Sequence, residues 1–165
     1  MSDFFLWVEG TSYATFVRES GSLWAFPMYL FMHTLGMATM VGGATMIAFA
    51  LLGLWPKNVP IKPLVRLYPM MWAAFYVNLF TGVSIFFKDA NSYGRNTDFY
   101  VKLVFVIAGV LVMRRMQRDL VNDPQLDKGP VPGHLKNLAM LSLFCWFAAI
   151  VAGRLIAYVG PVPGL

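Results

Sequence analysis

The chain has 165 residues, of which 58% are hydrophobic and only 13% are charged, with a formal net charge of +5 at pH 7. This balance excludes an ordinary water-soluble domain, because a fold of this size buries too little surface to hide so many apolar side chains. The basic residues lie in short segments between apolar runs, which favours membrane topology and a lipid bilayer as partner over nucleic-acid binding. The single cysteine, Cys145, excludes a disulfide framework.

The fold class expected is all-α: an integral membrane four-helix bundle with an N-terminal interfacial amphipathic helix, in a single membrane domain covering 1–165. Segment 3–20 mixes aromatic residues with Glu9, Arg18 and Glu19, so it is too polar to span and predicts the interfacial helix. Four apolar runs predict transmembrane helices at 23–55, 65–88, 98–120 and 135–159.

Features within these runs refine the prediction. Pro27 suits the first turn of the first transmembrane helix. The third run has the shortest uncharged core, since Lys102 lies close to its start. Small residues four apart, Ala38 with Gly42 and Thr39 with Gly43, would let another helix approach closely, either within the monomer or across a homo-oligomer.

The distribution of basic residues predicts the orientation in the membrane. With four spans, both termini share one side, and that side carries Arg18, Lys88, Arg95, Lys102 and Arg154. The other side carries more basic residues: Lys57, Lys62, Arg66, Arg114, Arg115, Arg118, Lys128 and Lys136. The positive-inside rule therefore places both termini on the outer side of the membrane.

The two histidines occupy different environments. His134 lies in a Pro/Gly-rich connector, where a solvated side chain is expected. His33 lies about 10 residues into the first transmembrane helix, roughly 10–15 Å below the outer surface. An ionisable group at that depth normally faces the bundle interior and has a partner. Three roles stay open: a hydrogen bond to a neighbouring helix, a ligand to haem or a metal, and proton transfer.

Other helices bring polar groups to a similar depth. The second helix carries a polar stripe of Asn78, Thr81, Ser84 and Lys88. Lys102 lies near the start of the third helix, and Arg154 lies near the end of the fourth with Tyr158 four residues on. A basic layer without an embedded carboxylate predicts an anionic partner, such as haem b propionates, a lipid phosphate or a small anion. The alternative is that these cations reach out to phospholipid headgroups.

Methionine supports a second type of ligand. Met37 and Met40 share the helix face of His33, and thioethers with imidazole favour Cu(I). Core packing is the alternative, because methionine fills irregular apolar gaps. Motifs of proteases, di-iron enzymes and ATPases are absent, so the sequence gives no catalytic residues.

The chain resembles an uncharacterised bacterial family of small four-helix inner-membrane proteins. The resemblance rests on Trp24, Pro27, His33 and Gly36 in LWAFPMYLFMHTLGMA, on Thr81-Gly82, on Lys102 in DFYVK, and on Gly153, Arg154 and Tyr158 in GRLIAY. The family often has an acidic residue three before the histidine and an Asp-Leu-Arg triplet near the end of the first helix. Leu30 and Ala48-Phe49-Ala50 stand there in this chain.

A fainter similarity is to cytochrome b561-like and copper-resistance membrane proteins. Those proteins supply several membrane histidines, whereas this chain supplies one, so a second axial histidine would need a second chain.

Two functional hypotheses follow. The first is a membrane subunit that binds a redox cofactor for electron transfer, with haem b preferred over copper. It assigns His33 as axial ligand, places Arg154, Lys102 and Lys88 near the propionates, adds Thr81 and Tyr158 to the cofactor site, and gives Met37 with His33 to a metal. The second is a cofactor-free scaffold or accessory subunit of a larger membrane complex.

Overall fold

Every secondary-structure element is a helix within the residues that the computed structural model describes, which are 2–56, 59–123, 127, 129–156 and 158. No strand occurs among these residues, so the all-α prediction is confirmed. Three helical segments are long and apolar enough to cross a membrane: Phe26–Leu51, Lys62–Lys88 and Gly133–Leu155. These segments support the prediction of a membrane protein.

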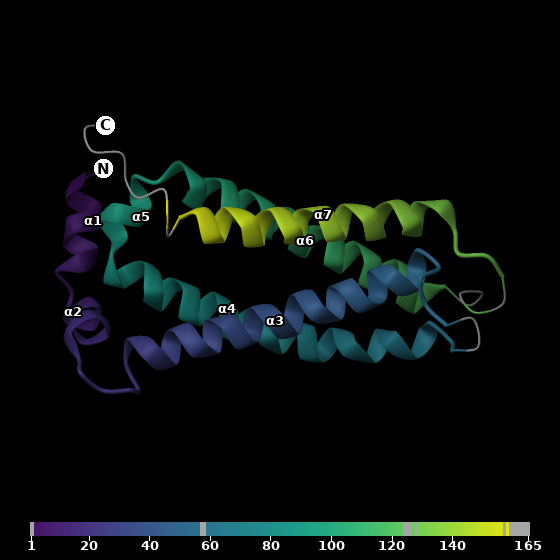
Figure 1. Ribbon diagram of the computed structural model, residues 1–165, viewed down its shortest axis with the longest axis horizontal. Helices are drawn as coiled ribbons and strands as arrows, with labels where there is room; N and C mark the ends of the chain where they lie inside the picture. The colour runs from purple at the N-terminus through teal and green to yellow at the C-terminus, as the bar shows by residue number, and fades with distance from the viewer. Residues whose placement is uncertain (1, 57–58, 124–126, 128, 157, 159–165) are drawn as a thin grey trace.

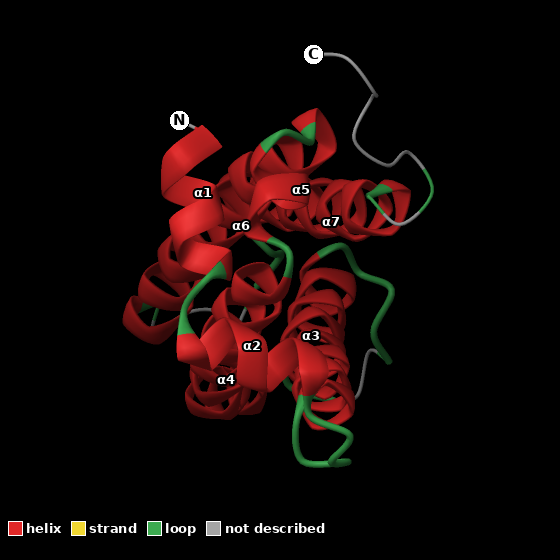
Figure 2. Ribbon diagram, turned by 90° about the vertical axis from the view of Figure 1, so that its left-hand side faces the viewer, coloured by secondary structure: helices red, strands yellow, loops and turns green. Residues whose placement is uncertain are grey.

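Four long helices run side by side through the described chain (Figure 1): α3 (Phe26–Leu51), α4 (Tyr68–Lys88), α6 (Thr97–Asn122) and α7 (Gly133–Leu155). α3 packs against α4, α6 packs against α7, and contacts between α3 and α7 join the two pairs. An end-on view shows the pairs as two layers (Figure 2). The main contacts therefore follow the order α4, α3, α7, α6, with α4 and α6 as the outer members.

The ends of α3 follow from one proline and one glycine. Pro27 lies in the first turn, where its missing N–H would be unpaired in any case. At the other end, Gly53 has φ of 82°, and the Leu54 N–H donates to the Phe49 carbonyl at 2.9 Å. This left-handed cap satisfies the last carbonyls and ends the helix at Leu51, before the expected boundary at 55.

α4 is preceded by a short 3₁₀ helix, η1 (Lys62–Leu67), and both segments have proline in their first turn. α4 ends at Lys88, and a further short helix, α5 (Ala90–Gly94), follows between the runs predicted at 65–88 and 98–120. α7 ends at Leu155, and the end of the run predicted at 135–159 lies partly outside the described residues.

α6 differs from the other long helices in carrying charge. Asn96 caps its start by accepting from the Asp98 N–H at 2.8 Å. Its second half contains Arg114, Arg115 and Arg118, and Arg115 pairs with Asp119 one turn on, at 2.9 Å. These charges explain why α6 is not among the three segments that are apolar enough to span.

The N-terminal segment forms two helices, α1 (Ser2–Glu9) and α2 (Ser12–Glu19), where the sequence predicts a single helix over 3–20. The break falls at Gly10 and Thr11. α2 packs on α4 and α1 on α5, so the two short helices lie across one end of the long helices (Figure 1).

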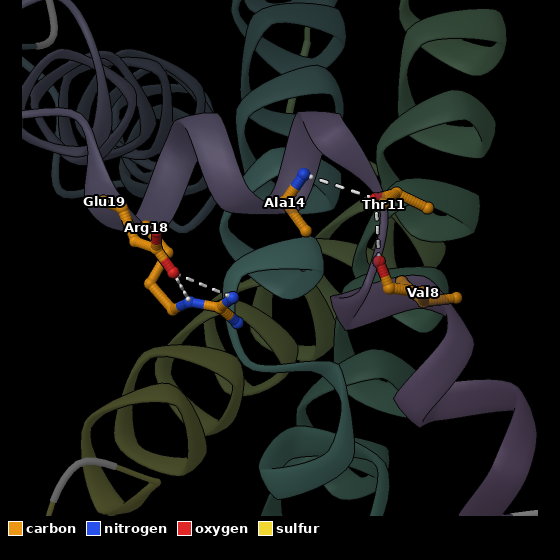
Figure 3. A network of polar contacts seen from close by, with 5 residues as sticks. All are labelled: Val8, Thr11, Ala14, Arg18 and Glu19. Carbon is orange, nitrogen blue, oxygen red and sulfur yellow. Dashed lines mark hydrogen bonds and ion pairs between the residues drawn. The ribbon is translucent and has the colours of Figure 1, made fainter.

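Thr11 accounts for this break (Figure 3). Its hydroxyl donates to the Val8 carbonyl at 2.8 Å and accepts from the Ala14 N–H at 3.3 Å. One side chain thus ends α1 and caps α2, which is a role that threonine fills well at helix starts. The single-helix prediction missed the break because it treated 3–20 as one amphipathic pattern.

The hydrophobic core lies in the half of the long helices remote from α1 and α2. Its fully buried large side chains are Ile47, Leu51, Tyr68, Met71, Met113, Met116, Leu120 and Leu135. These positions are the end of α3, the start of α4, the end of α6 and the start of α7. The half near α1 and α2 is packed less completely, and it contains the candidate site.

Candidate functional site

A pocket of about 330 Å³ lies between the long helices, in the half near α1 and α2. Its wall is mainly apolar, and its polar members are His33, Asn78, Lys102 and the indole of Trp146. All four long helices contribute: His33, Met37, Met40 and Val41 on α3; Phe75, Asn78, Leu79, Gly82, Val83 and Phe86 on α4; Phe99, Lys102, Leu103 and Val106 on α6; and Trp146, Ala149 and Ile150 on α7.

His33 is held against α4 through one ring nitrogen. Its Nδ1 lies 3.1 Å from the Asn78 carbonyl oxygen and 3.1 Å from Thr81 Oγ1. A carbonyl oxygen only accepts hydrogen bonds, so Nδ1 carries the proton and donates it. In the neutral ring, Nε2 is then the nitrogen with a free lone pair. Both hydrogen-bond contacts of His33 within the described chain use Nδ1, so Nε2 has no hydrogen-bond partner among the described residues.

Two glycines allow α3 and α4 to approach closely at this point. A Cβ added at Gly36 would lie 3.0 Å from the Ala74 carbonyl oxygen. A Cβ added at Gly82 would lie 3.0 Å from His33 Cε1. Both distances are tighter than ordinary packing contacts, so the position of the His33 ring depends on glycine at these two sites.

Lys102 brings a positive charge to the pocket from α6. Its methylene chain runs along α7, since a Cβ added at Gly153 would lie 3.4 Å from Lys102 Cδ and Cε. No aspartate or glutamate lines the pocket, and Lys102 forms no ion pair with any described residue. An unneutralised ammonium beside an apolar wall favours a ligand with an acceptor oxygen or a negative charge.

Two buried polar atoms of the lining residues have no hydrogen-bond partner within the described structure: Asn78 Oδ1 and Trp146 Nε1. Trp146 is only 3% exposed. Leaving a buried donor or acceptor unpaired costs about 1–3 kcal/mol. Both atoms are closed to water in this packing, so these two residues line the pocket through their other atoms.

Aromatic rings close the pocket toward α1 and α2. Phe86 on α4 and Phe99 on α6 stack with ring centroids 5.4 Å apart and an interplanar angle of 19°. Phe5 of α1 meets Phe86 edge-on at 6.2 Å, and Tyr93 of α5 stacks on Phe86 at 6.4 Å. Burial, reinforced by Asp89, raises the pKa of the Tyr93 phenol, so this ring stays neutral in the cluster.

The pocket is open on its side between α4 and α6. Leu79 and Val83 on α4 are 51% and 48% exposed, and Leu103 on α6 is 39% exposed, although all three line the pocket. α4 and α6 meet at the stacked rings of Phe86 and Phe99 and at Trp72, whose Nε1 donates to Gln117 Oε1 at 2.7 Å. The opening lies between these two contacts.

The residues predicted for the cofactor site fall into two groups in the structure. His33, Met37 and Lys102 line the pocket, and Thr81 is buried against His33.

The other three predicted site residues do not line the pocket. Lys88 Nζ lies 3.8 Å above the ring centroid of Phe26. Arg154 donates to the Tyr158 hydroxyl at 3.2 Å, and both side chains are exposed. Ser84, in the same stripe, accepts from the Tyr13 hydroxyl at 2.7 Å and so fixes α2 to α4.

Several pocket residues were not predicted as part of the site. Asn78 was recognised only as a member of the stripe, although its position three residues before Thr81 already placed it on the same face. Trp146, Phe86 and Phe99 carry no distinguishing pattern, because aromatic residues occur throughout the apolar runs.

No family model matches this chain, and neither the comparison with curated proteins nor the comparison with solved structures finds a match.

Proposed function

We propose that this chain is a multi-pass protein of the bacterial inner membrane in which the four long helices form a transmembrane bundle. α6 is the fourth span: it packs against α7, and its 26 residues are enough to cross a hydrocarbon core of about 30 Å. Its arginines then reach the interface at the basic end. Both termini lie on the periplasmic side, with α1 and α2 in the interface.

The pocket around His33 binds a redox cofactor in the periplasmic half of the membrane, and the protein serves in electron transfer. One observation carries this proposal: Nδ1 of His33 is fixed by a carbonyl of α4 while Nε2 is left free in a pocket. Proteins orient imidazole ligands in the same way, because a hydrogen bond at one nitrogen sets the tautomer and the ring direction for the other.

Haem b fits this pocket only in part. Imidazole is a common axial ligand of haem iron, and Lys102 is suited to pair with a propionate. However, a cavity of about 150 Å³ is known to hold benzene, so about 330 Å³ suits one substituted ring rather than a porphyrin of four pyrroles. Two expected propionate partners, Lys88 and Arg154, lie outside the pocket, as does Tyr158, which was also expected in the cofactor site. The donor set fits one axial bond, while the volume does not fit the macrocycle.

Copper has a weaker donor set here. His33, Met37 and Met40 line the same pocket, and this combination suits Cu(I). The described residues contain no group of three His, Cys, Asp or Glu side chains that could hold a metal ion. A copper site would therefore depend on one imidazole and thioethers.

The test is the composition of the purified full-length protein, after expression with haem precursor and copper supplied. Absorbance spectra, metal analysis and chromatography of an organic extract should together show one redox-active compound at near one equivalent per chain. His33→Ala should lose most of it. His134→Ala is the matched control, because this second histidine is exposed in the connector before α7, and it should retain the compound. Wild-type protein without any redox-active compound would contradict the proposal.

A cofactor-free scaffold is the second candidate, and one observation favours it. Gly42 has no atom within 4 Å of an added Cβ, and Ala38 one turn earlier is exposed, so a small-residue face of α3 is uncovered. A scaffold predicts that Gly42→Leu disrupts assembly in native electrophoresis while His33→Ala leaves it intact. The cofactor role alone predicts no effect of Gly42→Leu on the bound compound.

A further inference from the structure

We propose that the ligand of the His33 pocket is a lipid-soluble quinone, whose head group is held between His33 and Lys102 and which enters from the bilayer between α4 and α6. This inference rests on the proposed function and names the class of cofactor. It concerns binding of the quinone and quinol forms, with no redox step assigned to this chain.

The side opening determines how a ligand reaches the pocket. Leu79, Val83 and Leu103 form its edge, and each is exposed by more than a third of its surface. With the long helices in a bilayer, these side chains contact acyl chains. The stacked rings of Phe86 and Phe99 block the route from the aqueous end. A ligand therefore comes sideways from lipid, which selects apolar molecules.

The volume of the pocket favours a ligand whose head group is a single ring. About 330 Å³ is roughly twice the cavity that holds benzene, so it accommodates one substituted six-membered ring and the first part of an attached chain. The remainder of an isoprenoid tail extends through the opening past Leu79 and Val83 into the bilayer. A molecule held this way needs no larger cavity.

The polar lining residues His33 and Lys102 serve the two states of a quinone. Lys102 is a donor, and the carbonyl oxygens of a quinone are acceptors. His33 Nε2 is an acceptor, and the hydroxyls of the quinol are donors. Each state therefore gains a hydrogen bond from the pocket, from Lys102 for the quinone and to His33 for the quinol.

A fatty acid uses this pair of residues less completely. Its carboxylate would pair with Lys102, but in the charged form it has no proton to donate to His33 Nε2. The hydroxyls of a quinol supply such a donor, and the carbonyls of the quinone supply an acceptor for Lys102.

Binding can be measured on the full-length protein in lipid nanodiscs. The probe is a benzoquinone with a decyl tail, followed by quenching of tryptophan fluorescence and corrected with empty nanodiscs. Wild-type protein should bind saturably at one site per chain. Lys102→Met should weaken binding at least about tenfold, because a hydrogen bond to a charged group is lost. Lys88→Met is the matched control, since Lys88 lies at the same end of the long helices but outside the pocket, and it should bind as wild type.

A second pair of variants tests the route without touching the polar groups. Leu79→Trp places a bulky ring at the opening and should reduce binding or slow its onset several-fold. Val104→Trp places the same ring on α6, where Val104 is 63% exposed and does not line the pocket, and it should have no effect. Both substitutions face lipid, so the fold of the bundle is retained in each.

The outcomes separate this inference from the proposed function. Absence of saturable binding by the wild type, or equal binding by Lys102→Met and Lys88→Met, would overturn the quinone assignment. Purification with stoichiometric haem or copper and no quinone would also overturn it while leaving the redox-cofactor role intact. Absence of every redox-active compound, together with no quinone binding, would overturn both.

Discussion

The position of the His33 ring depends on single residues of the facing helices. Gly36 lets α3 approach the Ala74 carbonyl, and Gly82 leaves room for the imidazole on α4. With the ring in this place, its Nδ1 reaches the Asn78 carbonyl and the Thr81 hydroxyl. The position of the ring, and with it the direction of Nε2, therefore depends on glycine at both of these sites.

Alanine substitution at two glycines of α3, Gly36 and Gly42, should change the stability of the protein in different ways. Gly36→Ala should destabilise the protein by about 1–3 kcal/mol, because its Cβ would meet backbone that cannot move aside. Gly42→Ala lies on the same helix with no neighbour in reach, and it should be neutral or slightly stabilising, since alanine favours helix more than glycine does. Thermal unfolding in detergent compares the two. Equal melting temperatures would show that α3 and α4 are not closely packed at Gly36.

How far the site could be predicted follows from helix geometry. Counting residues from the helix ends gives the depth of each residue along the helices. This count predicts His33 and Thr81 at a similar depth, and in the structure the two side chains are in contact. Depth does not give the rotation of a helix about its axis. Arg154 was expected near His33 for its depth alone, but α7 turns this residue outward to Tyr158. That Asn78 and Trp146 line the same pocket could be recognised only from the folded structure.

At the scale of elements, α1 and α2 fix the closed end of the pocket. The Tyr13 hydroxyl donates to Ser84 at 2.7 Å, and Glu9 accepts from the Asn91 N–H at 2.6 Å. The contact of Phe5 with Phe86 joins α1 to the aromatic closure. The two short helices therefore act as a cover over one end of the long helices.

Removing the cap of α2 should loosen this cover alone. Thr11→Ala should cost about 1 kcal/mol, the usual contribution of an N-cap, and so speed amide exchange in Ser12–Glu19 by about fivefold. Ser12→Ala changes a neighbouring exposed residue and should leave exchange as in wild type. Hydrogen exchange followed by mass spectrometry resolves this segment. Unchanged exchange in Thr11→Ala would mean that the cap does not hold α2.

The elements themselves were predictable to different degrees. Long uncharged runs predict helices. In lipid, the backbone N–H and C=O groups must form hydrogen bonds within the chain over a span of about 20 residues. Their ends are set by local conformations that hydropathy does not register, such as Gly53 in its left-handed state after α3. The break at Thr11 and the short helix α5 escaped prediction for the same reason, since both depend on individual hydrogen bonds.

On the scale of the whole molecule, the two ends of the long helices differ in charge and in packing. The end with Arg114, Arg115 and Arg118 has the dense core, while the opposite end has the pocket under α1 and α2. The proposed orientation places the basic end in the cytoplasm. The pocket then faces the periplasmic half of the bilayer.

Cysteine labelling tests this orientation at two glycines where the described structure leaves space for a side chain. In a Cys145→Ser background, Gly21→Cys between α2 and α3 should react with a membrane-impermeant reagent applied from the periplasmic side. Gly129→Cys, between α6 and α7, should react only after permeabilisation. A Cβ added at either position has no atom of the described residues within 4 Å, so both substitutions should be tolerated. The reverse pattern would invert the proposed orientation.

The central claim is that His33 presents a bare Nε2 to a ligand, and ¹⁵N NMR of histidine-labelled protein tests it most directly. Only His33 and His134 contribute signals, so His33→Ala assigns both. The account predicts a proton on Nδ1 and an unprotonated Nε2 for His33, with the Nε2 signal shifting when the quinol form of decyl-benzoquinone is added to stripped protein. The His134 signals should stay unchanged. A proton on Nε2 of His33, or a His33 signal unaffected by this addition, would contradict the account.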